Sequence, residues 1–390
     1  MSRKQLMLAA LAGGALVLSA CGGGDDSGDT DTIVVAVAGP MTGENAIYGK
    51  NQLAGVKFAA SQINAAGGIE SGPFKGATIE VKQFDDVADP NQGASVAQKM
   101  CDDDDIMAVF GHSNSSVTLA AMPIYERCGL PLFVSYSSNP EITAELHENV
   151  FRTLIDDASM GSEMAYQAGR DIGAKKVGLL ASDDDYGTGL VESFEETAPD
   201  AGLEVVDAIA TTTGQKDFTP QLTTLRNKGI DTLVLLNTYT DAALQIKQAD
   251  ALGWDDVKIL VTAGSNTPEL VKIAGKDAVE GVLVNAVFDP NSSTEGVASF
   301  VEAYSQENGE APGEANAVAY DSFFVFLEGL QDGAKDRESL ISSVADTESF
   351  ELPIRGTFTF DENQGAAVDP DSPATALLEI NDGEFVSFTP

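Results

Sequence analysis

The sequence of 390 residues is poor in basic residues, which bind nucleic acids, and in Cys and His, which bind zinc. It has 22 Lys and Arg against 61 Asp and Glu, a formal net charge of −39. Phosphate contact needs clustered Lys and Arg, so this balance argues against nucleic acid as a partner, and such a surface also repels anionic membranes. With only His112 and His147, and no Cys/His cluster, neither a zinc site nor another cofactor is expected. Dense carboxylates hold hydration, and we expect a salty native environment.

Long hydrophobic runs are absent except near the N-terminus. Arg3 and Lys4 precede an apolar run at 6–18 that is too short to be a good membrane span, and Leu-Ser-Ala-Cys follows at 18–21. Small residues leading to Cys21 resemble a bacterial lipobox. We therefore predict a lipoprotein signal peptide over 1–20, a flexible Gly/Ser/Asp tether over 21–32 and an extracytoplasmic protein anchored to the cell membrane by lipid on Cys21. An ordinary secretory signal with a chance Cys is the alternative, and it also implies export.

Cysteine is scarce, and only Cys101 and Cys128 remain beyond the leader. Each lies at the end of a predicted helix, on either side of a predicted strand at 106–110. Neighbouring strand–helix units bring such ends close together, and an even pair outside the cytosol suggests a disulfide. We therefore predict a bridge between Cys101 and Cys128.

Apolar runs and helical periodicities alternate along the chain. The predicted strands of the alternating part are 33–38, 78–84, 106–110, 130–134, 177–181, 204–209, 232–236, 258–261 and 281–285. Predicted helices lie at 52–65, 90–100, 158–172, 190–198, 218–227, 241–252, 268–274, 295–307, 314–329 and 338–345, and late strands at 356–360, 375–380 and 384–388. Two such alternations in series predict an α/β protein with two parallel-sheet lobes.

The stretch 106–125 shows how a site could form. A buried strand ends at Gly111, polar residues follow over 112–116, and apolar residues then return in helical rhythm. Ser and Asn before such a run are N-cap residues, and a helix start suits an anion such as a carboxylate. The carboxyl ends of parallel strands are where open α/β sheets bind ligands. An ordinary, well-capped turn explains the same pattern.

Several short segments, in this order, resemble those of a known family. They are AVAGPMTGENAIYG at 36–49, QINAAGG at 62–68, FDDVADPNQ at 84–92, GHSNSS at 111–116, YSSNPEIT at 136–143, DDDYGTGL at 183–190 and GTFTFDENQG at 356–365. As an ordered set they resemble the branched-chain amino-acid (leucine/isoleucine/valine) binding proteins of ABC transporters, which are type I periplasmic binding proteins. The resemblance covers about 33–388.

The resemblance implies two Rossmann-like lobes joined by three crossing segments, with a ligand in the cleft and hinge closure around it. It implies an N-terminal lobe of 33–149 and 286–357 and a C-terminal lobe of 150–285 and 358–390. The expected partners are a small amino acid, amide or carboxylate ligand and the membrane subunits of an ABC permease.

The resemblance also implies ligand-binding residues. Ser115 matches a hydroxyl that holds the ligand carboxylate at a helix start, and Ser138 matches a Thr that binds both ligand ends, beside the carbonyl of Tyr136. The matching aromatic residues are Tyr48, Tyr186 and Tyr239. The family's disulfide is missing, because Ala88 and Asn114 stand at what look like its positions.

One departure leaves the ligand open. The family's acidic partner for the ligand's amino group falls at Ala263, and no acid lies between Lys258 and Thr267. A desolvated ammonium without a partner is costly. Either another acid, such as Asp184 or Asp241, replaces it, or the ligand has no α-amino group.

Two other functions fit parts of the sequence. A sensory protein of the same fold would carry the same motifs. GHSNS at 111–115 nearly spells the GxSxG motif of serine hydrolases, with Ser113 as nucleophile and His147 as base, but its last Gly is Ser. We expect a binding protein that performs no chemistry.

Overall fold

The computed structural model describes residues 32–369 and 373–389. The predicted signal peptide, the lipidation of Cys21 and the tether up to residue 31 lie outside these residues. In the part of the chain that is described, no helix combines the length and apolar character needed to cross a bilayer.

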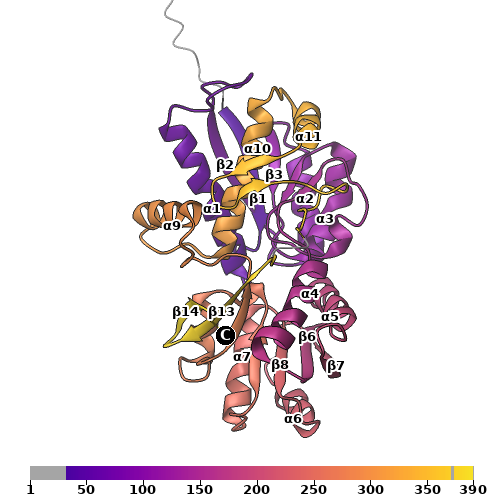
Figure 1. The fold of residues 1–390 in the computed structure, drawn as a ribbon. Coiled ribbons are helices and arrows are strands. Elements are labelled where there is room, and N and C mark those ends of the chain that lie inside the picture. Colours follow the sequence, from indigo (N-terminus) through magenta and orange to yellow (C-terminus); the bar gives the residue numbers. More distant parts are fainter. Residues whose placement is uncertain (1–31, 370–372, 390) are drawn as a thin grey trace, which may run out of the picture. The chain divides into compact units, whose positions relative to one another are not determined.

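The first sheet has five parallel strands in the order β2-β1-β3-β4-β5 (Figure 1). Its strands are β1 (Thr32–Gly39), β2 (Thr78–Asp85), β3 (Ile106–Phe110), β4 (Leu132–Val134) and β5 (Val150–Arg152). Helices α1 (Ala46–Ala65), α2 (Pro90–Cys101) and α3 (Ser115–Cys128) connect them, and a 3-10 turn, η1, spans Pro140–Ile142. Residues 150–152 thus pair in this sheet, although the predicted C-terminal lobe begins at 150. The lobe ranges as a whole stay a prediction.

Both faces of this sheet are covered, which explains why its strands are apolar throughout. Successive side chains of β1 point to opposite faces. Val35 and Val37 pack in a core with residues of α1 and of α10 (Glu314–Gln331), whereas Val34 and Ala36 pack with α2 and α3. Continuous apolar strands are typical of parallel sheets buried on both sides.

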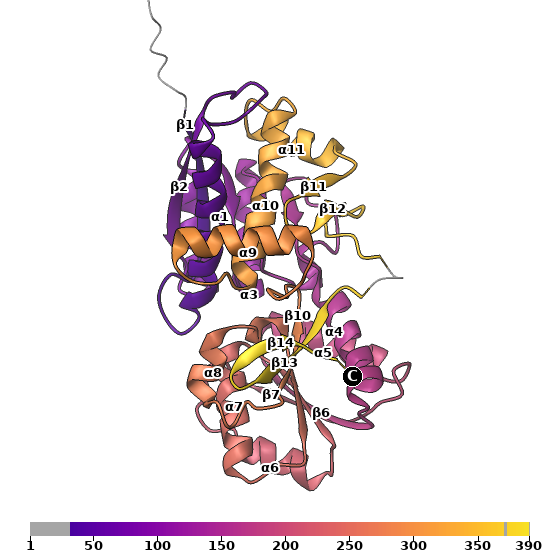
Figure 2. The same cartoon turned by 60° about the vertical axis from the view of Figure 1, so that its left-hand side comes forward.

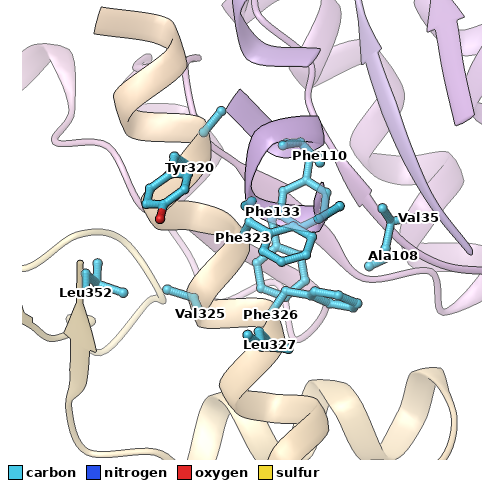
Figure 3. Close-up of a cluster of buried hydrophobic side chains, with 14 of the residues drawn as sticks. Val35, Ala108, Phe110, Phe133, Tyr320, Phe323, Val325, Phe326, Leu327 and Leu352 are labelled. Atoms are coloured by element: carbon cyan, nitrogen blue, oxygen red, sulfur yellow. The ribbon is translucent and has the colours of Figure 1, made fainter. Parts of the chain in front are cut away.

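Late segments of the chain complete this first core. Figure 3 shows Phe110 of β3 and Phe133 of β4 against Phe323 and Phe326 of α10, with ring centroids of Phe110 and Phe323 5.8 Å apart. Helix α9 (Glu295–Asn308) lies across α1 and α10 in Figure 2. The ring of its Phe300 packs against Phe58 of α1 and Tyr320 of α10. Helix α11 (Arg337–Asp346) and the antiparallel pair β11 (Phe350–Leu352) and β12 (Gly356–Phe358) follow.

The second sheet has seven strands in the order β14-β13-β10-β9-β8-β6-β7. Its parallel strands are β6 (Lys176–Ser182), β7 (Glu204–Thr211), β8 (Thr232–Leu236), β9 (Lys258–Val261) and β10 (Leu283–Ala286), and β13 (Ala376–Asn381) and β14 (Glu384–Ser387) add an antiparallel hairpin at the β10 edge. Its helical segments are α4 (Asp157–Tyr166), the π-helical η2 (Gln167–Ile172), α5 (Asp185–Thr197), α6 (Thr219–Asn227), α7 (Tyr239–Ala251), the 3-10 turn η3 (Ala263–Ser265) and α8 (Pro268–Ala274). The order of its parallel strands repeats that of the first sheet.

The chain passes between the two sheets after β5, after β10 and after β12. These passages are the crossing segments that the resemblance implies. The architecture is therefore the predicted α/β fold with two parallel-sheet lobes.

A disulfide joins the ends of two neighbouring helices in the first lobe. Cys101 is the last residue of α2 and Cys128 the last of α3, and the structure pairs them. The predicted bridge is therefore present in the structure.

Candidate functional site

Strands of both sheets end at one cavity of about 250 Å³. Most of its lining residues follow strands of the first or the second sheet, and Glu314 comes from the start of α10. Because the strands are parallel, their carboxyl ends form the edge at which such sheets bind ligands. The residues predicted to bind ligand that line it are Tyr48, Ser115, Tyr136, Ser138 and Tyr186.

Ser115 begins α3 at the wall of this cavity. Its hydroxyl oxygen accepts hydrogen bonds from the backbone N–H groups of Ser138, at 3.4 Å, and Asn139, at 3.2 Å. It therefore ties the start of α3 to the turn that follows β4. The predicted side-chain cap is not formed: Asn114 occupies the N-cap position, but its side chain makes no capping hydrogen bond. The unsatisfied N–H groups and the dipole of the helix start remain available to an anion.

His112 is fully buried behind this helix start. Its Nδ1 lies 2.6 Å from Asp86 Oδ2 and its Nε2 lies 2.9 Å from the Tyr125 hydroxyl. Ser113 instead donates its hydroxyl proton to Gln52 Oε1, at 2.7 Å. Both ring nitrogens of His112 are thus engaged away from Ser113.

His147, the base that the hydrolase alternative requires, lies elsewhere on the first lobe. Its Nδ1 is 3.8 Å from Glu126 Oε1, and it does not line the cavity. The described residues therefore offer Ser113 no histidine base, and the hydrolase alternative lacks its catalytic geometry.

Tyr48 joins parts of both lobes at the cavity. Its hydroxyl donates to the Gly264 carbonyl, at 2.5 Å, and accepts from the backbone N–H of Tyr239, at 3.2 Å. Its ring centroid lies 5.5 Å from those of Tyr136 and Tyr239. Tyr239 does not itself line the cavity, because its hydroxyl donates to the Glu44 carbonyl. In this structure Tyr239 supports the wall from behind.

Tyr186 lies in the first turn of α5, on the side of the second sheet. Helix α5 starts earlier than predicted, because Asp184 caps it by accepting the Gly187 N–H at 2.9 Å. The Asp184 carboxylate also accepts the Ser182 hydroxyl, at 2.7 Å. Burial raises the pKa of Tyr186 well above its ordinary value, so the ring faces the cavity as a neutral phenol.

The sequence suggests two acids as partners for an amino group. One of them is already hydrogen-bonded within the protein, and the other does not line the cavity. Asp184 lines the cavity, but it already serves as the cap of α5. Asp241 does not line the cavity, and its Oδ2 accepts the Gly214 N–H at 3.0 Å. Ala263, where the resemblance expects an acid, lines the cavity without a charge.

Glu314 is the acid in the cavity wall that sequence reasoning missed. It is the first residue of α10, only 3% exposed, and its Oε2 accepts from the Val287 N–H at 3.1 Å and the Asn266 side-chain amide at 3.2 Å. The Tyr136 hydroxyl donates to its Oε1 at 3.4 Å. Burial raises the pKa of the carboxyl to about 8, although these hydrogen bonds oppose the rise. Glu is rarely fully buried, and a Glu in the first turn of a helix is favourable without any ligand, so no local pattern indicates the burial of Glu314.

Comparison with known proteins identifies the family. The sequence profile of the family described as "Periplasmic binding protein" matches residues 32–384. The chain belongs to this family. A leucine-, isoleucine-, valine-, threonine- and alanine-binding protein from Pseudomonas aeruginosa is 30% identical over 334 residues, with 85% of this chain and 86% of the relative covered. The Leu/Ile/Val-binding protein of Escherichia coli is 28% identical, with coverages of 85% and 87%.

Solved structures of periplasmic binding proteins share the fold. A leucine-binding protein from Thermotoga maritima superposes with a TM-score of 0.82 at 27% identity, covering 92% of this chain and 98% of that one. A branched-chain amino acid transporter substrate-binding protein from Streptococcus pneumoniae, solved with isoleucine, has a TM-score of 0.83 at 26% identity, with coverages of 91% and 98%. These relatives are substrate-binding proteins of transporters and not enzymes, and the periplasmic binding protein family acts outside the cytoplasm.

Proposed function

We propose that this protein is the substrate-binding lipoprotein of an ABC importer of the branched-chain amino-acid type. It captures an amino acid, or a related small amide or carboxylate, by hinge closure. The observation that carries the proposal is the cavity of about 250 Å³ at the strand ends of both sheets, with Ser115 at a helix start in its wall. The volume lies below the roughly 300–1,000 Å³ of sites for drug-sized ligands, which suits a small solute.

The contacts around the cavity suggest how a ligand is held. The start of α3 and the hydroxyls of Ser115 and Ser138 suit a carboxylate or amide oxygen. The rings of Tyr48, Tyr136 and Tyr186 suit an apolar side chain. No catalytic group is needed: the ligand stabilises the closed form by its higher affinity for that form, and the permease recognises closure.

Ligand capture and closure are tested together. A thermal-shift screen of amino acids, amides and small carboxylates identifies binders, and calorimetry measures their affinity. Small-angle X-ray scattering with and without the best binder then measures closure. We expect a smaller radius of gyration with ligand. Absence of any binder would refute the function, and an unchanged radius with ligand bound would refute hinge closure.

The lipid anchor is a separate part of the proposal. It rests on the sequence around Cys21, outside the described residues. Mass spectrometry of the mature protein should show a diacylglyceryl group on an N-terminal Cys21, and Cys21→Ser should release the protein from membranes. Release of the unmodified wild-type protein into the medium would contradict anchoring.

A further inference from the structure

We propose that Glu314 is the counter-charge for an ammonium group of the ligand, so that the protein selects solutes with a primary amine over their deaminated counterparts. The inference rests on the proposed function and narrows its ligand class to amino acids. It assigns a specificity-determining residue on α10, far along the chain from the segments that carry the helix-start site.

The carboxylate of Glu314 lies in the wall of the cavity. Glu314 lines the same cavity as Ser115, and its side chain comes from the first turn of α10. An ionised carboxylate in so buried a place is costly unless a positive charge pairs with it. Within residues 32–369 and 373–389, no Lys, Arg or His forms an ion pair with Glu314.

The two oxygens of the Glu314 carboxylate differ in their hydrogen bonds. Oε2 accepts two hydrogen bonds, from the Val287 N–H and the Asn266 amide, which hold the carboxyl group in the wall. Oε1 has the long contact from the Tyr136 hydroxyl, at 3.4 Å, and the Phe288 backbone N–H also hydrogen-bonds the carboxyl group. A carboxylate oxygen can accept more than one hydrogen bond, and an ammonium group offers three donors. Oε1 is therefore the atom we assign to the ligand.

The other acids near the cavity are less suited to pair with an ammonium group. Asp184 is the only other acid among the described residues that line the cavity, and it caps α5. Asp157 is fully buried near Ser138, and burial raises its pKa well above the ordinary value, but it does not line the cavity. Glu314 thus combines access to the ligand with the absence of a protein cation.

The ionisation of Glu314 should make the affinity for an amine ligand depend on pH. The titratable side chains that face it are Tyr48, Tyr136 and Tyr186, and burial raises the pKa of each, so they stay neutral. With a pKa of about 8, Glu314 is mostly protonated at pH 7 and must lose its proton to pair with an ammonium. Affinity for an amine ligand should therefore rise from pH 6 to 8, by up to about tenfold per pH unit, and level off above the pKa.

The test compares L-leucine with 4-methylpentanoate, which has the same side chain and carboxylate but no amine. If leucine does not bind, the best binder of the screen and its deaminated form are compared instead. Affinities and proton release are measured by calorimetry at pH 7 in buffers of different ionisation enthalpy. The wild type should prefer the amine and release close to one proton for each ligand bound. Glu314→Gln should lose about 30-fold or more in affinity for the amine ligand, change little toward the deaminated acid and release no proton.

Asp157→Asn is the matched control, since it neutralises the other buried acid of this region. It should keep both the amine preference and the proton release. Retained amine affinity in Glu314→Gln, or loss of proton release in Asp157→Asn alone, would overturn the assignment while leaving the proposed function intact. If Glu314→Gln binds neither ligand, circular dichroism tests whether it is folded, and the variant Glu314→Asp is measured as well. A folded Glu314→Asp that binds without preferring the amine also overturns the assignment. A folded Glu314→Asp that keeps the amine preference supports the assignment. If no solute of the screen binds the wild type, the proposed function fails and this inference with it.

Discussion

Ser115 has one hydroxyl group that supports the local structure and that we propose also binds the ligand. Its oxygen accepts the N–H groups of Ser138 and Asn139, so its own proton is free to be donated to a ligand oxygen. Because the side chain is 3% exposed, no water readily replaces it. Its loss would leave a ligand acceptor and two backbone donors poorly satisfied.

We therefore expect Ser115→Ala to weaken ligand binding by roughly 1–3 kcal/mol, measured by calorimetry. Thr224→Ala is the control, because the Thr224 hydroxyl is exposed and bonds only to the carbonyl of Pro220 in its own helix. Equal affinities of the two variants would remove Ser115 from the binding site.

For single residues, the sequence predicts much of the cavity wall but not the charged group in it, Glu314. The resemblance implies Tyr48, Ser115, Tyr136, Ser138 and Tyr186, and all five line the cavity, each after the end of a strand. Tyr239 follows a strand end too, but its hydroxyl is bound to the Glu44 carbonyl.

The sequence does not point to Glu314, because this residue does not come directly after a strand of either sheet. It reaches the cavity only because α10 packs on the first sheet through Phe323 and Phe326. Such long-range packing leaves no local signal in the sequence.

The elements themselves were more predictable than the side chains they position. The turn Asp382-Gly383 joins β13 and β14, with both residues at positive φ, as the Asn-Asp-Gly sequence indicates. The short strand β5 is not among the predicted strands, because three residues give no period.

The disulfide supports one pair of elements, α2 and α3. It closes a loop between cysteines 27 residues apart, and constraining the unfolded chain over such a loop is worth about 3–4 kcal/mol. It joins the C-terminal ends of the helices, whereas Ser115 lies at the opposite end of α3, about 20 Å away at 1.5 Å per residue.

The double variant Cys101→Ser, Cys128→Ser should therefore unfold at lower urea concentration, with stability reduced by about 3–4 kcal/mol. Its ligand affinity should stay within about twofold of the wild type at 25 °C, since the bridge is remote from the cavity. The wild type under reducing conditions is the matched comparison. An unchanged urea midpoint in both would show that the bridge does not constrain the unfolded chain.

At the scale of the whole molecule, charge is the dominant departure from an ordinary protein. An excess of 39 negative charges opposes compaction through self-repulsion. The ion pairs that join Lys or Arg to a carboxylate are few beside this excess, and most of them involve exposed side chains, which contribute little. Screening the repulsion should therefore stabilise the fold.

We expect the unfolding temperature to rise by several degrees between 0.05 and 1 M sodium chloride, measured by scanning calorimetry. Most of the rise should come below about 0.5 M, because the screening length falls from about 10 Å at 0.1 M to about 3 Å at 1 M. An unfolding temperature that is flat or falls with salt would argue against adaptation to a salty environment.

The hairpin of β13 and β14 has a consequence for biosynthesis. It covers β10, a strand synthesised about ninety residues earlier, and without it the backbone of β10 is an open apolar edge on which other chains can add. The second sheet is therefore not complete until residues 376–387 have been synthesised. A stop codon just before residue 376 should yield an aggregating product rather than a smaller binding protein, because the apolar edge of β10 would then stay uncovered.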